Sequence, residues 1–311
     1  MQFKIVSTKK AITHILAHSI KLKNLVLRKG IVLSQEHISM LIKHNINEVY
    51  VAIKESHDYS ENLSAKLIAE HITQKKLFKI IVSNGRADIY AKINGVLKLN
   101  IRALLKINSD FQNIAVSTLQ NYSFVTRGRL VGNVKILPYA LNKKDILKIT
   151  KNIYIKKIFN LSKKTVHKVA IIFTANDIKN TNKEKLLKAV NSRLDKFSLC
   201  VNLVFFCKHN HKSLSVELKK VLEKNIDLIL IYGETSISDI NDVVPRSIKD
   251  TKGKIISSIM PTDPGNLLLV AKINRKDIIG VPGCAKSIKR NGFDDILERV
   301  CHGEKFTRKK I

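Results

Sequence analysis

Short apolar runs alternate with segments of helical pattern from residue 166 onward, and this alternation limits the fold more than any other feature. Val166–Phe173 is apolar almost throughout, as in a strand buried on both faces. Thr181 and Glu184 then stand at capping-box spacing before a segment with leucines on one face. Further strands are expected at Leu199–Phe206, Asp227–Tyr232, Lys254–Ile259 and Asp277–Val281, and helices at Ser213–Lys224 and from about Pro245. The pattern predicts βαβ units around a mostly parallel sheet.

The first half mixes strand and helix patterns without such regularity. Ser60–Ile72 has helical spacing with Ser60 as N-cap. Strands are predicted at Glu48–Ile53, Lys79–Ser83, Asp88–Ile93, Asn113–Leu119 and Leu130–Leu137, with turns at Asn84-Gly85 and Arg127-Gly128. A Lys/Asn-rich stretch, Asn142–Lys164, precedes the second half. The expected fold class is α/β: a three-layer sandwich with a mostly parallel sheet over 161–311, preceded by a smaller mixed α+β domain over 1–160.

The charge balance is strongly basic, with 56 Lys+Arg against 25 Asp+Glu and a formal net charge of +31. One explanation is a polyanionic partner. The other is codon drift in an AT-rich genome, since Lys, Asn and Ile are all abundant. The basic residues are spread along the chain, and neither a zinc finger nor an RNP aromatic motif is present. We favour drift and do not expect nucleic acid as the partner.

Cellular location follows from the apolar runs and the thiols. The longest apolar stretches are far shorter than the roughly 20 residues of a membrane helix. The N-terminal segment is interrupted by charge, unlike a secretory signal. The four cysteines form no C-x-x-C pair, which favours reduced thiols. We expect a soluble cytoplasmic protein without a membrane partner.

The first candidate binding segment runs from Gly233 to Pro245, where a predicted strand gives way to a helix. Gly233 permits a tight turn, and Thr235 and Ser236 supply hydroxyls. The free N–H groups of the following helix favour an anion such as phosphate. Asp242, with the nearby Asp239, is a possible Mg²⁺ ligand between phosphates. The alternative is that Asp242 only caps the helix.

Two more segments follow predicted strands. Met260–Asn266 is a rigid turn with Asp263 and Gly265. Gly280–Asp294 combines small residues such as Gly283 and Cys284 with Ser287 and the basic Lys286, Lys289 and Arg290. Loops after parallel strands meet on one edge of the sheet, so the three segments are expected to converge. His209 and His211 lack a third metal ligand and are interpreted as a solvated loop. The closing Arg308-Lys309-Lys310 is interpreted as an ordinary charged terminus.

In this order the three segments resemble the molybdopterin-binding domain family. Its Gly-Gly-Thr-Ser/Gly loop, followed by Asp and Pro, corresponds to Gly233–Ser236 with Asp242 and Pro245. The closer resemblance is to a subgroup with the blocks MPxDPGN and GxPGCxxSxxxNGFD, which match Met260–Asn266 and Gly280–Asp294. Matching segments in the first half, among them Leu16–Ser19 and Asn84–Arg86, extend the resemblance over nearly the whole chain.

The resemblance implies a site for molybdopterin, or its adenylylated form, together with Mg²⁺ and, in catalytic members, molybdate. By position it implies that Asp242 is the catalytic residue and Mg²⁺ ligand. It assigns the pterin contacts to Gly233, Thr235, Ser236, Asp263, Gly265, Gly283 and Ser287. It also implies other cofactor-biosynthesis enzymes as partners, and we expect a homo-oligomer.

The chain departs from the family pattern at three places. Glu234 replaces the second glycine, one residue near Ile240 is extra, and Lys208–His211 lacks the carboxylate that catalytic relatives place there. Binding is therefore better supported than catalysis. The expected function is cofactor biosynthesis as a molybdotransferase-like enzyme. The alternatives are a non-catalytic carrier, a module serving a nucleotidyltransferase, or a basic nucleic-acid-binding protein.

Overall fold

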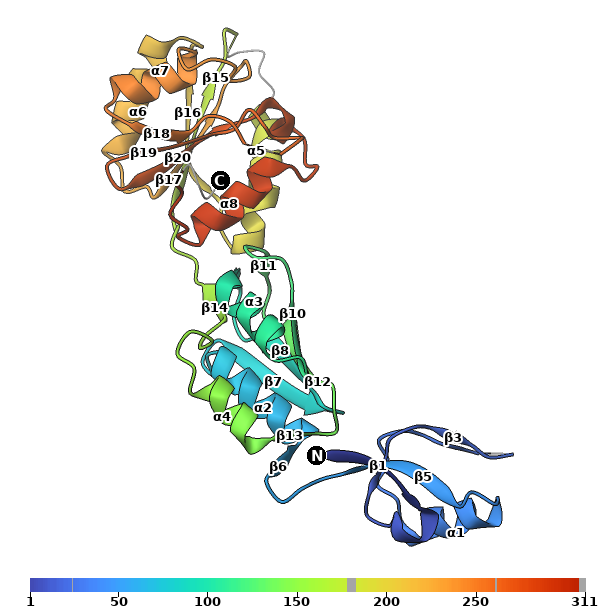
Figure 1. Ribbon diagram of the computed structural model, residues 1–311. Coiled ribbons are helices and arrows are strands. Elements are labelled where there is room, and N and C mark those ends of the chain that lie inside the picture. The colour runs from blue at the N-terminus through green and yellow to red at the C-terminus, as the bar shows by residue number, and fades with distance from the viewer. Residues whose placement is uncertain (24, 178–182, 261, 308–311) are drawn as a thin grey trace. The chain divides into compact units, whose positions relative to one another are not determined.

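Two compact units make up the chain, Met1–Leu161 and Ser162–Ile311 (Figure 1). The computed structural model describes residues 1–23, 25–177, 183–260 and 262–307. Thr181 of the expected capping box, Pro261 and the basic run Arg308–Lys310 lie outside these ranges. The first unit is the longer of the two, so the prediction of a smaller N-terminal domain was wrong.

The first unit contains two separate hydrophobic cores. The one nearer the N-terminus includes Ala11, Leu16, Leu33, Leu41 and Val51. It lies under a sheet of order β1-β5-β2, with β1 Gln2–Ser7, β5 Glu48–Ile53 and β2 Ile15–Leu16. Accompanying elements are η1 (Thr8–Lys10), β3 (Ile20–Lys21), β4 (Val26–Leu27) and α1 (Gln35–Lys43).

The second core of this unit is formed by residues between Ala65 and Leu161. Its main sheet consists, in order, of β10 (Ile114–Thr118), β12 (Leu130–Ile136), β8 (Arg86–Ala91) and β7 (Phe78–Ser83). The Asn84-Gly85 turn of the predicted hairpin has positive φ at both residues, +47° and +67°, as a type I′ hairpin turn requires. Ser60 caps its helix by accepting the N–H of Leu63 at 3.3 Å.

Among the elements around this core, β7, β8, β10, β12 and α2 (Glu61–Ile72) correspond to predicted segments, and the sequence patterns did not predict the others. The strands are β6 (Asp58–Ser60), β7 (Phe78–Ser83), β8 (Arg86–Ala91), β9 (Gly95–Leu99), β10 (Ile114–Thr118), β11 (Phe124–Val125), β12 (Leu130–Ile136), β13 (Ala140–Asn142) and β14 (Phe159–Ser162). The helices are α2 (Glu61–Ile72), α3 (Ile101–Asp110) and α4 (Lys143–Thr150).

The second unit is organised around a sheet of order β16-β15-β17-β20-β19-β18, whose first four strands are parallel. The strands are β15 (Val169–Thr174), β16 (Val201–Cys207), β17 (Leu228–Tyr232), β18 (Lys254–Ser257), β19 (Leu269–Ile273) and β20 (Lys276–Val281). The predicted mostly parallel sheet is confirmed. β19 is not among the predicted strands, and it pairs antiparallel with both of its neighbours.

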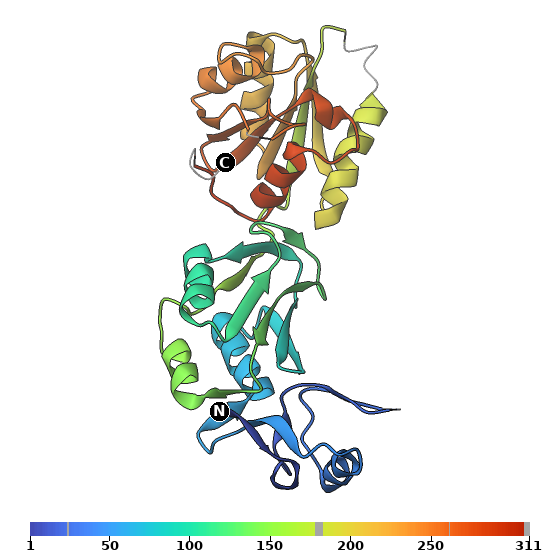
Figure 2. The same ribbon diagram turned by 45° about the vertical axis from the view of Figure 1, so that its right-hand side comes forward.

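Helices lie on both faces of this sheet (Figure 1 and Figure 2). α6 (His211–Leu222) and α7 (Val243–Asp250) bury Leu214, Leu218, Val244 and Ile248 against one face. α5 (Lys183–Leu194) and α8 (Gly292–Cys301) lie on the other, and η2 (Asp195–Phe197) and η3 (Gly283–Lys286) are short turns. Every residue of β15 and β17 is buried, which explains their uninterrupted apolar sequence.

The strand directions bring several loops to one edge. β15, β16, β17 and β20 end there, and β19 begins there because Leu269 is paired with Gly280. We call the loops 175–177, 208–210, 233–242, 262–268 and 282–291 the strand-end rim. None of the described helices is long and apolar enough to span a bilayer.

Candidate functional site

The loop after β17 is held by a histidine from the loop after β16. His209 Nδ1 lies 2.7 Å from Thr174 Oγ1, and its Nε2 lies 3.0 Å from Thr235 Oγ1. The loop is partly exposed, and the ring of His209 in addition links the ends of three strands, a role that the sequence did not predict. His211 is also paired, with Asp250 at 3.1 Å. The sequence contains no spacing signal for this link, since its partners are 35 and 26 residues away.

Glu234, which occupies the position of the family's second glycine, is engaged with the loop after β15. Its carboxylate accepts the N–H of Asn176 at 2.8 Å, and its own N–H donates to Thr174 Oγ1 at 3.3 Å. Its carbonyl accepts the Lys286 ammonium at 3.4 Å. The preceding Gly233 has little room for a side chain, because a Cβ there would lie 2.8 Å from the Thr235 carbonyl oxygen.

Asp242 closes its own loop. Its Oδ2 accepts the N–H of Ser238 at 2.7 Å, the N–H of Asp239 at 2.9 Å and the Ser238 hydroxyl at 3.2 Å. These bonds, led by that from Asp239, lower the pKa of the carboxyl. Asp242 stands at the N-cap of α7, but its side chain makes no capping bond to that helix. The alternative that it merely caps the helix was therefore wrong.

A preassembled metal group is not found on the rim within the described ranges. Among all described residues, the one group of three potential metal ligands is Glu55, His57 and Asp58, which belongs to the first unit and not to the rim. The Asp242 carboxylate braces its loop, so it does not by itself resemble a dedicated Mg²⁺ site.

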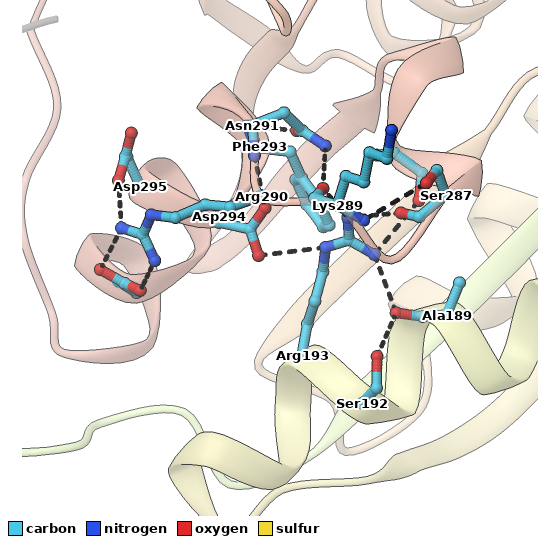
Figure 3. Close-up of polar contacts among 12 residues, drawn as sticks. Ala189, Ser192, Arg193, Ser287, Lys289, Arg290, Asn291, Phe293, Asp294 and Asp295 are labelled. Atoms are coloured by element: carbon cyan, nitrogen blue, oxygen red, sulfur yellow. Dashed lines mark hydrogen bonds and ion pairs between the residues drawn. The ribbon is translucent and has the colours of Figure 1, made fainter.

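The loop after β20 reaches the loop after β17. A Cβ added to Gly283 would lie 3.3 Å from Ser236 Oγ, so the glycine allows close approach. Ser287 follows η3 as its C-cap and is exposed. Arg193 of α5, 2 % exposed, holds this loop through the carbonyls of Ala285, Ser287 and Lys289 (Figure 3). Sequence reasoning missed Arg193, because a lone arginine in an amphipathic helix usually faces solvent.

The loop before β19 leans on the start of α8. The N–H of Gly292 donates to the Pro264 carbonyl at 2.9 Å. Gly265 is buried with φ +120°, and a Cβ there would lie 2.7 Å from the Gly292 nitrogen. Asp263 is exposed. Burial raises the pKa of the Cys284 thiol, and the nearby charge of Asp263 adds to that rise. The second and third segments therefore lie together.

A cavity of about 730 Å³ opens between α5 and the loop after β20. Its lining residues are Lys185, Leu186, Lys188, Ala189, Gly283, Cys284, Lys286, Ser287 and Ile288. Three of these are lysines and none is acidic, so the cavity favours an anion. Of the predicted site residues, Gly283 and Ser287 line it. Gly233, Thr235, Ser236, Asp242, Asp263 and Gly265 lie on the rim without lining it.

Tyr232, the last residue of β17, adds an unsatisfied polar group beneath the rim. Its side chain is buried, and its hydroxyl has no hydrogen-bond partner within the described part of the chain. Burial raises the pKa of this phenol, and the charges of Arg193, Asp294 and Cys284 also act on it. The hydroxyl therefore stays protonated at neutral pH and is available as a donor.

Comparisons with known proteins give structural similarities only. No family model matches the sequence, and no curated protein is similar to it. Molybdenum cofactor biosynthesis protein B is similar in structure, with 13 % identity, a TM-score of 0.30, and 44 % of this chain and 88 % of that chain covered. A molybdenum cofactor biosynthesis protein from Pyrococcus furiosus has 12 % identity and a TM-score of 0.26, and the match covers 98 % of this chain and 66 % of that chain.

A third similar structure is the molybdopterin biosynthesis moeA protein from Pyrococcus horikoshii OT3. It has 11 % identity and a TM-score of 0.29, with 98 % of this chain and 76 % of that chain covered. All three structures are of molybdenum cofactor or molybdopterin biosynthesis proteins. Because every TM-score is below 0.5, we draw no functional conclusion from these similarities.

Proposed function

We propose that the second unit binds an anionic pterin, molybdopterin or its adenylylated form, at the strand-end rim, and that the protein serves molybdenum-cofactor biosynthesis. The observation that carries the proposal is the meeting of the loops after β17 and β20 at Ser236 and Gly283, beside the lysine-lined cavity. The sequence blocks Met260–Asn266 and Gly280–Asp294 support it independently.

The groups at the rim suit the two ends of such a ligand. Lys185, Lys188 and Lys286 supply positive charge for a phosphate. The exposed hydroxyls of Thr235 and Ser236 can donate to its oxygens. The exposed Asp263 carboxylate can accept from the amino edge of a pterin ring. These groups come from three loops, so the ligand would bridge them.

The structural role of the Asp242 carboxylate favours binding over group transfer. Its carboxylate is the acceptor that closes the Ser238–Asp242 turn, which is a structural task. We therefore propose a carrier that receives the cofactor from, or passes it to, other biosynthetic enzymes. A molybdotransferase that uses Mg²⁺ and molybdate is the second candidate, and the position of Asp242 at the start of α7 favours it.

The direct test is mass spectrometry of small molecules released from the anaerobically purified protein, followed by titration with released molybdopterin. Lys286→Ala should weaken binding about tenfold, the value of one charge-assisted hydrogen bond. Lys254→Ala is the matched control, since Lys254 is exposed and begins β18 at the opposite edge of the sheet. Equal affinity of both variants and the natural protein would contradict the proposed site.

A further inference from the structure

β7 is an edge strand of the main sheet in the first unit. The order β10-β12-β8-β7 gives it one neighbour, β8, and no strand of the described residues lies on its other side. Its pairing with β8 is regular over all six residues, without a bulge. The strand contains no proline, and Lys79 is its one charged residue. β7 therefore has few of the features that keep an edge strand from pairing with a further strand.

The register with β8 shows which backbone groups of β7 face the open edge. In an antiparallel ladder, hydrogen-bonded pairs alternate with pairs that make no hydrogen bond. The N–H of Lys92 donates to the carbonyl of Leu77 at 2.8 Å, so these two residues form a hydrogen-bonded pair that continues the register. In steps of two along the ladder, Ile81 bonds to β8, whereas the N–H and C=O groups of Ile80 and Val82 face the open edge.

The hairpin turn gives the same result independently. Asn84 and Gly85 form a two-residue turn with positive φ at both positions, and Ser83 and Arg86 flank it as the closing hydrogen-bonded pair. Two residues before Ser83 stands Ile81, which again bonds to β8. The backbone groups of Ile80 thus have no strand partner, and they make no hydrogen bond outside the ladder within the described chain.

The side chains of β7 alternate between the core and solvent. Phe78 is buried in the second core of the first unit, and Ile80 and Val82 are partly buried against it. Ile81 on the opposite face of the sheet is 46 % exposed. A strand added at this edge would continue both rows, so a suitable partner has apolar or β-branched residues at alternate positions.

A cavity of about 440 Å³ opens at the start of the same strand. Its lining residues are Glu70, Thr73, Lys75, Phe78, Lys79, Ile80 and Lys92. Three lysines against one glutamate give the cavity a positive charge balance, and all three lysines are exposed. The C-terminal end of an added antiparallel strand would lie beside the first residues of β7, and so beside this cavity. Charge complementarity therefore favours carboxylates at that end of the partner.

We propose that β7 is the docking edge for an extended acidic segment of another protein, which adds to the sheet as an antiparallel strand. Backbone hydrogen bonds to Ile80 and Val82 would supply affinity, and carboxylates in the lysine-lined cavity would supply specificity, as in other cases of strand addition. A second copy of this chain would bring Ser83 and Asn84 to the cavity, and neither is acidic. The docking edge belongs to the first unit and does not depend on the proposed pterin site.

The experiment uses the full-length chain labelled with ¹⁵N-isoleucine and ¹⁵N-valine and titrated with the peptide acetyl-Thr-Val-Thr-Val-Asp-Asp, which has a free C-terminus. The amides of Ile80 and Val82 should show the largest shifts, and the amide of Ile81, which bonds to β8, is the internal comparison. The control peptide acetyl-Thr-Val-Thr-Val-Asn-Asn-amide has the same shape without carboxylates. It should bind at least about tenfold more weakly, since charge-assisted hydrogen bonds are lost.

Three variants test the backbone and the charge separately. Val82→Pro removes an N–H of the open edge without removing a bond to β8, and should weaken binding of the acidic peptide at least about tenfold. Lys79→Ala should weaken it about threefold, the value of an exposed ion pair. Lys66→Ala is the matched control and should leave the affinity unchanged, because Lys66 is exposed on α2 and does not line the cavity. Circular dichroism and thermal unfolding establish that each variant is folded.

Each result decides the proposal. Shifts centred on other amides would overturn it, as would equal affinity for the two peptides or no binding at millimolar peptide. Shifts of Ile80 and Val82 that follow protein dilution instead of added peptide would assign the edge to a second copy of the chain, and would also overturn it. If Val82→Pro does not fold, the amide shifts of the natural sequence and the comparison of Lys79→Ala with Lys66→Ala decide.

Discussion

Polar side chains at the rim act first as braces between loops. His209 joins Thr174 to Thr235, and Asp242 closes the turn that begins at Ser238. Such residues stabilise a loop conformation because the net favourable free energy of each hydrogen bond exceeds the conformational entropy lost when its groups are ordered. Their substitution should therefore affect both stability and affinity.

Replacing Asp242 by alanine should lower the free energy of unfolding by about 1–2 kcal/mol at neutral pH, because two N–H groups lose their acceptor. The pKa of Asp242 is lowered in the folded state, so the stabilisation is present above the unfolded pKa of about 3.9. It is lost as the pH falls through the folded pKa. Urea unfolding of both proteins at neutral and acidic pH measures the difference between their free energies of unfolding. This difference should shrink on acidification, and an increase would contradict the prediction.

A second substitution at this position, Asp242→Asn, separates the two proposed functions. A carrier should keep measurable molybdopterin binding after Asp242→Asn, because the amide oxygen can still accept from the loop. A transferase that depends on this carboxylate should lose turnover while still binding. Anaerobic binding and transfer assays on one preparation give both values.

His209→Ala should weaken molybdopterin binding severalfold and cost about 1 kcal/mol of stability, since two hydroxyl contacts are lost. His44→Ala is the control, because His44 is exposed and is the C-cap that follows α1 in the first unit. Calorimetric titration and thermal unfolding of the two variants test the prediction. An effect of His44→Ala equal to that of His209→Ala would show that the rim histidine has no special role.

At the scale of elements, the site depends on how the loops are seated against α5, α7 and α8. The loop after β20 is held by Arg193 of α5, and the loop before β19 by the first residues of α8. The closest contacts between these loops and helices occur at glycines. Gly265 combines φ +120° with backbone atoms of Gly292 within 3 Å of any added Cβ.

Gly265→Ala should destabilise the protein by at least about 2 kcal/mol, because strained backbone and a steric clash with backbone act together. Gly128 offers the matched control, since it also has positive φ, +85°, but nothing within 4 Å of an added Cβ. Gly128→Ala should therefore cost only about 1 kcal/mol. Chemical denaturation of both variants provides the comparison, and equal losses would refute the steric part of the argument.

At the scale of the whole molecule, the second unit carries its own sheet and its own core. That core includes Ala170, Ile172, Ile229, Ile231 and Leu269. The rim loops and the cavity described above also belong to this unit alone. Its folding should therefore not require the first unit.

Residues 162–311, expressed alone, should unfold cooperatively and bind molybdopterin with affinity within a few fold of the full chain. Circular dichroism and anaerobic titration measure both properties. A folded fragment without affinity would show that the first unit contributes to the site.

The sequence by itself determined the periodic elements and the edge at which the three segments converge. Alternation of apolar strands and amphipathic helices predicts parallel strands, and parallel strands place their following loops together. The sequence analysis did not predict β19, because periodicity alone cannot distinguish a strand from a buried helix segment in an apolar run of five residues.

Only the tertiary structure decided how the rim is held. Arg193 lies 101 positions from Asp294, and His209 lies 26 positions from Thr235. Such pairings depend on which helix packs against which loop, and local spacing does not encode that. The sequence could therefore predict Gly283 and Ser287 as candidate site residues, but it could not reveal that a buried guanidinium holds their loop through three of its carbonyls.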